Sequence, residues 1–197
     1  MIREEKQRLE HTCRHPRPKS PEEFDKNRMK RIEANDPVAI RDVGLECYYE
    51  GDYNTAFEYW TKAAGLGDAD AHYELSVMYG EGECVEKDEK KTVHHLEQAA
   101  IAGHPNARHA LGCHEGKSGR VDRAIKHFII AANLGHDNSL ETLRSLYTQG
   151  LVRKEGYAAA LRAHKAAVDA TKSGGSRRSY ATNSLEVVIS SIIPSGS

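Results

Sequence analysis

The chain has 197 residues, of which 29% are charged, and its formal net charge is −1 at neutral pH. A charge so close to zero gives no overall basic field, so we expect no nucleic-acid partner and no attraction to an anionic membrane. Its apolar stretches fall short of the ~20 residues that a membrane-spanning helix needs. The first residues, MIREEKQRLEH, are charged where a secretory leader would be apolar. These features predict a cytoplasmic or nuclear protein.

The cysteines are too scattered to indicate a local metal site or a disulfide framework. Cys13, Cys47, Cys84 and Cys113 contain no pair with the CxxC spacing of zinc ligands. We therefore expect reduced thiols, no bound metal and no cofactor.

Residues 1–35 form a charged N-terminal segment. Within it, the stretch from Pro21 to Ala34 is predicted to be a helix that leads into the rest of the fold. Asp36 and Pro37 then mark the start of the next helix, because Asp is a favoured N-cap and Pro is favoured in the first turn.

From this point the chain repeats itself. The phrase AAGLGDADA at 63–71 returns as AAIAGHPNA at 99–107 and as AANLGHDNS at 131–139. Four Ala pairs, beginning at Ala63, Ala99, Ala131 and Ala166, are separated by 36, 32 and 35 residues. This period is typical of a helix-turn-helix solenoid unit.

The Ala pairs belong to the second helix of each unit, the B helix. Small or apolar residues seven and three positions before each pair complete one helical stripe, and Gly follows in the first three units. The stripe residues before the pairs are Ala56 and Trp60, Thr92 and Leu96, Ala124 and Phe128, and Ala159 and Ala163. Since Ala lets neighbouring helices approach closely, B helices should pack between adjacent units.

An A helix precedes each B helix, with its own recurring stripe. The stripe comprises Ala39, Val43 and Gly44; Ala71, Leu75 and Ser76; Ala107, Leu111 and Gly112; and Ser139 and Leu143, where Arg144 breaks the pattern. His104-Pro105 marks one further A-helix start. Four extra residues in the second unit fall in EGECVEKDEKK, which predicts a longer turn there.

These residues resemble the Sel1-like repeat family, and the second unit shows the pattern best. Its Ala71, Leu75, Tyr79, Asp88 and Ala99-Ala100 fall at the family's positions. The resemblance implies an all-α, right-handed α-solenoid of about four repeats, similar to tetratricopeptide arrays. We expect repeats at 36–67, 68–103 and 104–135, a degenerate fourth at 136–170, and a flexible tail at 171–197.

The resemblance also implies a function, namely a non-enzymatic scaffold or adaptor that binds a protein or peptide. Stacked A helices line a concave surface in such arrays, which suits a peptide or a helix. The positions predicted to line it are Arg41, Leu45 and Tyr48; Tyr73 and Val77; His109 and Cys113; and Glu141 and Ser145. For Tyr48 and Tyr73, filling gaps between A helices is the alternative.

Two alternatives belong to other functional classes. In some Sel1-repeat proteins the array follows a RING-like zinc finger, whose tail Cys13-Arg14 and Pro16 resemble, although Glu10 stands where another cysteine is needed. On this alternative the chain is the substrate-recognition remnant of a ubiquitin-ligase-like protein. The other alternative is an enzyme that uses His109 and Cys113, which lie four apart on one helix but make only half a metal or catalytic site.

The end of the chain allows two structures. Residues 171–184 have the Gly, Ser and charged composition of a linker. The apolar stretch at 185–193 either caps the last repeat or stays disordered.

Overall fold

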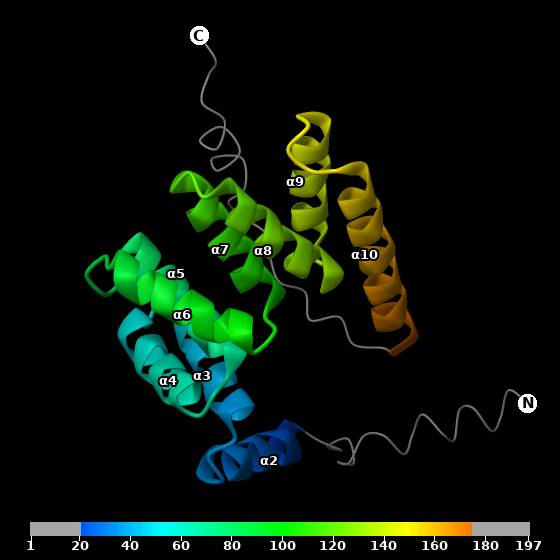
Figure 1. Ribbon diagram of the computed structural model, residues 1–197. Coiled ribbons are helices and arrows are strands. Elements are labelled where there is room, and N and C mark those ends of the chain that lie inside the picture. Colours follow the sequence, from blue (N-terminus) through cyan, green and yellow to red (C-terminus); the bar gives the residue numbers. More distant parts are fainter. Residues whose placement is uncertain (1–20, 175–197) are drawn as a thin grey trace, which may run out of the picture.

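The computed structural model describes residues 21–174 of the chain, and the regular structure in this range is helical (Figure 1). The helices are α2 (Pro21–Glu33), α3 (Pro37–Tyr49), α4 (Tyr53–Gly65), α5 (Ala69–Glu81), α6 (Glu89–Ile101), α7 (Pro105–Lys117), α8 (Val121–Asn133), α9 (Asp137–Thr148) and α10 (Lys154–Gly174). The predicted helix at 21–34 corresponds to α2. None of the helices in 21–174 combines the length and the apolar character needed to cross a bilayer.

The helices pack as successive pairs. The A helices α3, α5 and α7 each pack against the B helix that follows them, and each B helix also contacts the next A helix. The last B helix, α10, packs on both α9 and α8. Each helix pair therefore packs against the pairs before and after it in the sequence, so the predicted all-α solenoid is confirmed.

A side-chain cap begins each A helix. Asp36 accepts from the Val38 amide at 3.0 Å, and Asp68 from the Ala71 amide at 2.8 Å. In the next two repeats the cap is an imidazole, whose Nδ1 accepts from the amide three residues on, at 3.2 Å for His104 and 3.1 Å for His136. The helix starts predicted at Asp36-Pro37 and His104-Pro105 are confirmed.

The core is built by the predicted stripes. The buried stripe residues of α4, α6 and α8 are, in that order, Ala56, Trp60, Ala63 and Ala64; Leu96, Ala99 and Ala100; and Ala124, Phe128, Ala131 and Ala132. The facing A helices supply glycine where the aromatic rings lie. A Cβ on Gly44 would come within 2.7 Å of the Trp60 ring, and one on Gly112 within 2.6 Å of the Phe128 ring. Glycine thus lets each ring pack directly against the A-helix backbone.

In the fourth repeat the predicted B-helix register is wrong by one residue. Ala159 and Ala166, which were placed on the stripe, are exposed, whereas Ala160 and His164 are buried. The stripe continues through Ala167, whose Cβ would lie 3.7 Å from a Cβ placed on Gly135. Alanine occupies several faces of α10, so its pattern alone could not identify the face that packs on α8.

The remaining predictions concern the turn of the second repeat, the C-terminal tail, the cysteines and the two ends of the chain. The longer turn of the second repeat lies between Glu81 and Glu89, as expected. The tail was predicted to begin at 171, but α10 continues to Gly174. Cys47, Cys84 and Cys113 are free thiols. The finger-like segment around Cys13 and the apolar stretch at 185–193 lie outside the described residues.

Candidate protein-binding face

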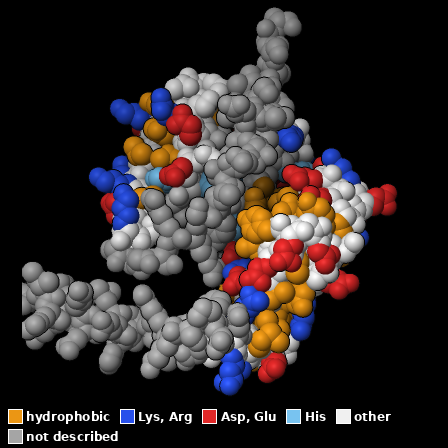
Figure 2. Space-filling view, turned by 180° about the vertical axis from the view of Figure 1, so that it is seen from behind, with side chains coloured by type: hydrophobic (Ala, Val, Ile, Leu, Met, Phe, Trp, Pro, Cys, Tyr) orange, Lys and Arg blue, Asp and Glu red, His pale blue; other side chains and the backbone are white. Residues whose placement is uncertain are grey.

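The candidate site is the side of the A helices that points away from their B helices, which we call the A-helix face. Ile40 and Gly44 face α4, so Asp42, Leu45 and Tyr49 fall on the opposite side of α3. In Figure 1, α4 and α6 lie in front of α3 and α5, so the reversed view in Figure 2 shows this face. Orange hydrophobic side chains there lie beside red Asp and Glu side chains.

The nine predicted residues fall into two groups. Leu45, Val77, Cys113 and Ser145 are half-buried, and Glu141 is exposed. The remaining four, described next, are engaged in contacts between helices or repeats: Arg41, Tyr48, Tyr73 and His109.

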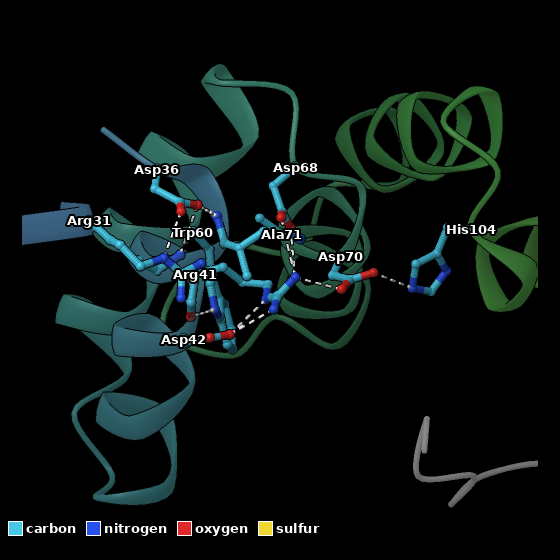
Figure 3. A network of polar contacts seen from close by, with 11 residues as sticks. Arg31, Asp36, Arg41, Asp42, Trp60, Asp68, Asp70, Ala71 and His104 are labelled. Carbon is cyan, nitrogen blue, oxygen red and sulfur yellow. Dashed lines mark hydrogen bonds and ion pairs between the residues drawn. The ribbon is translucent and has the colours of Figure 1, made fainter. Parts of the chain in front are cut away.

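Arg41 joins the first repeat to the second. Its guanidinium contacts Asp42 at 2.7 Å, Asp68 at 3.2 Å and Asp70 at 2.6 Å (Figure 3). Its backbone oxygen accepts from the Trp60 indole at 3.3 Å. These carboxylates raise the pKa of Arg41 although burial opposes them. Because its side chain is only 11% exposed, Arg41 has a structural role, and reversing its charge would disrupt the contacts between the first two repeats.

Tyr48 and Tyr73 occupy the gaps between helices. The Tyr48 ring lies 5.4 Å from that of Trp60, and its hydroxyl donates to Glu83 at 3.0 Å. Burial, followed by the Glu83 contact, raises the pKa of Tyr48 to about 12. Tyr73 stacks on His104 at 4.6 Å between ring centroids. The gap-filling alternative therefore describes both residues in this structure.

His104 continues this junction toward the third repeat. Its Nε2 lies 3.5 Å from Asp70, the carboxylate that also binds Arg41 (Figure 3). Burial lowers the pKa of His104, although Asp70 opposes that effect. The imidazole is consequently neutral at physiological pH, which lets its Nδ1 accept the capping hydrogen bond.

His109 and Cys113 do meet, but in a junction rather than a cleft. The sulfur lies 3.5 Å from His109 Nε2, and His109 Nδ1 lies 2.8 Å from the Ser139 hydroxyl of the next repeat. Burial lowers the pKa of His109 to about 4 and raises that of Cys113 to about 11. Both shifts favour the neutral forms, whereas nucleophilic catalysis needs a thiolate. His109 is also inaccessible to a binding partner, because only 7% of its surface is exposed.

Sequence reasoning missed several residues on the A-helix face, notably Asp42, Tyr49, Asp70 and Glu74. Their signal was the helical spacing itself, since they lie opposite the residues that face the B helix. Tyr49 is 78% exposed. Within residues 21–174, no three His, Cys, Asp or Glu side chains are grouped as metal ligands.

Comparisons with known proteins place this geometry in a family. The Sel1 repeat model matches residues 37–68, 69–104 and 105–136. Among solved structures, the chain is similar to a Sel1 repeat protein from Oxalobacter formigenes, at 25% identity and a TM-score of 0.54, over 61% of this chain and 96% of that one.

A second solved structure shares the fold alone. It is c5321, a protective antigen present in uropathogenic Escherichia coli strains displaying an SLR fold. The identity is 20% and the TM-score 0.54, over 85% of this chain and 39% of that one. A search of curated protein sequences found no match. Because the matched repeats cover about half of the chain and coincide with its stacked helix pairs, the protein belongs to the Sel1 repeat family.

Proposed function

We propose that this chain is a non-enzymatic scaffold that binds a partner protein or peptide on its A-helix face. Sel1 repeat proteins generally mediate protein–protein interactions, and the repeats make up most of the described residues. The observation that carries the proposal is the partly apolar surface left on this face. Tyr49 is 78% exposed, and Leu45 and Val77 keep part of their side-chain surface exposed.

The chemistry of the most reactive side chains supports a binding role over catalysis. The thiol of Cys113 and the imidazole of His109 are held in their neutral forms by burial. Other polar contacts of the A helices, such as those of Arg41, connect one repeat to the next. Such contacts maintain the surface but do not act on a substrate.

The test compares partner capture by variants on two faces. Tyr49→Ser/Val77→Ser alters the A-helix face, and the control Ile101→Ser/Leu134→Ser removes apolar side chains that are 75% and 45% exposed at the ends of two B helices. Each full-length protein is immobilised and exposed to cell lysate, bound proteins are quantified by mass spectrometry, and circular dichroism verifies folding. We expect the variant of the A-helix face to lose partners that the control variant still captures. Equal capture by both variants contradicts the proposal.

A further inference from the structure

The A-helix face is divided by charge along the array. In the first two repeats its positions include the carboxylates Asp42, Asp70, Glu74 and Glu81, and also Glu46, which pairs with Arg28 of α2. In the third and fourth repeats, Ala110 and Thr142 stand at the position of Asp42 and Glu74, Asn106 and Asn138 at that of Asp70, and Lys117 and Gln149 at that of Glu81. We call the face of α3 and α5 the acidic half-face. Orange and red side chains adjoin on this part of the surface in Figure 2.

One arginine faces several carboxylates within the acidic half-face. Arg41 contacts Asp42, Asp68 and Asp70 at distances from 2.6 to 3.2 Å (Figure 3). His104, beside Asp70, adds no charge at neutral pH because burial lowers its pKa. The single positive charge of Arg41 therefore cannot neutralise the three carboxylates that it contacts, and the half-face carries an excess of negative charge.

Glu74 lies beside these carboxylates and is ionised only in part at neutral pH. It is half-buried beside Arg41 and Asp70, and within residues 21–174 no hydrogen bond or ion pair reaches its carboxylate. Burial, and then Asp70, raise the pKa of Glu74 to about 7, while Arg41 opposes the shift. Ionised Glu74 thus lacks the cationic partner that a half-buried carboxylate favours.

We propose that the acidic half-face binds a basic protein segment, with Lys or Arg side chains alternating with apolar ones. This inference rests on the proposed function and specifies its partner. Charge complementarity supplies the argument, since an ammonium or guanidinium group would pair with Glu74 and Asp42. The surface of Leu45, Tyr49 and Val77 would pack against apolar residues and the methylene stems of the basic ones.

The experiment uses three fluorescein-labelled 12-residue peptides that share their Leu and Tyr positions and differ elsewhere, with Arg/Lys, Gln or Glu. Anisotropy measures their affinity for the full chain at low and physiological salt. Asp42→Asn/Glu74→Gln tests the half-face. The matched control, Glu58→Gln/Asp169→Asn, removes the same number of carboxylates from exposed positions of the B helices α4 and α10.

We expect the basic peptide to bind best and the half-face variant to weaken it by about tenfold, against less than about twofold for the control. An equal loss in both variants would mean general charge attraction and would overturn the inference. A neutral peptide that binds as well, and is lost in Tyr49→Ser/Val77→Ser, overturns the basic preference while supporting the proposed function. Self-association in sedimentation velocity that Asp42→Asn/Glu74→Gln abolishes would make a second copy the occupant and likewise overturn the inference.

Discussion

At the scale of single residues, Gly112 illustrates how the repeat pattern encodes packing. A Cβ at this position would lie 2.6 Å from the Phe128 ring, which the core holds 1% exposed. We expect Gly112→Ala to lower the free energy of unfolding by roughly 1–3 kcal/mol, because overpacking outweighs the gain of up to about 1 kcal/mol in helix propensity. Urea unfolding measured by circular dichroism provides the value.

Gly80 provides the matched control. It is also helical, but a Cβ there would meet Thr92 at an ordinary 3.5 Å. Gly80→Ala should therefore leave stability unchanged or raise it by up to about 1 kcal/mol. Equal destabilisation by both variants would contradict the ring-on-backbone packing.

The sequence predicts which helix positions recur but not what the residues at those positions contact. Arg41, Tyr73 and His109 occupy one register position of successive A helices, and this position would be open in an isolated repeat. In the array the next repeat covers it, through Asp70, His104 and Ser139 respectively. Such coverage depends on the angle between repeats, which a one-dimensional pattern does not contain.

At the scale of elements, α10 provides a direct test of its corrected register. Ala160 is 2% exposed and packs in the core of the last repeats, whereas Ala166 is exposed. We expect Ala160→Leu to cost roughly 1–3 kcal/mol by overpacking and Ala166→Leu to stay within about 0.5 kcal/mol of the parent. The measurement is the urea midpoint of each variant; the reverse order would restore the register expected from the Ala pairs.

The other B helices were predictable because each carries one bulky residue among small ones. Trp60, Leu96 and Phe128 identify the buried face, and the Ala pairs then fall into place beside them. In α10 the corresponding buried position holds His164, which the apolar pattern does not recognise. His164 faces Asp137 at 2.9 Å, so a polar contact replaces the missing aromatic or aliphatic side chain.

At the scale of the whole molecule, the junctions between repeats differ in chemistry along the array. The first uses Arg41 with Asp68 and Asp70. Later ones use imidazoles, with His104 beside Asp70 and His109 and His136 around Ser139. Helices α2 to α4 contain no histidine. Acid should consequently act on the later repeats before it acts on the first.

The direction follows from the pKa shifts. Burial lowers the pKa of His95 and His109 to about 4 and also lowers those of His104 and His136. Above pH 6.5, the ordinary value, folded and unfolded chains are both neutral at these sites. As the pH falls from 6.5 toward 4, the unfolded chain takes up protons first, so stability is lost in that window.

We therefore expect hydrogen exchange, followed by mass spectrometry at pH 5 and corrected for intrinsic rates, to show faster opening of α5 to α9 than at pH 7. The amides of α3 and α4 should keep more of their protection. His104→Asn retains a capping side chain without a titrating ring, so it should reduce the acid response at the junction of α5 and α7. Uniform loss of protection across all helices would contradict this gradient.

The position of Trp60 determines what optical spectroscopy can observe in this protein. It is the sole tryptophan of the chain, it is 1% exposed, and its indole donates to the Arg41 backbone within the repeat that contains no histidine. Its emission therefore reports on the first repeat, while far-ultraviolet circular dichroism averages over every helix. A difference between the two transition midpoints in acid would measure how weakly neighbouring repeats are coupled.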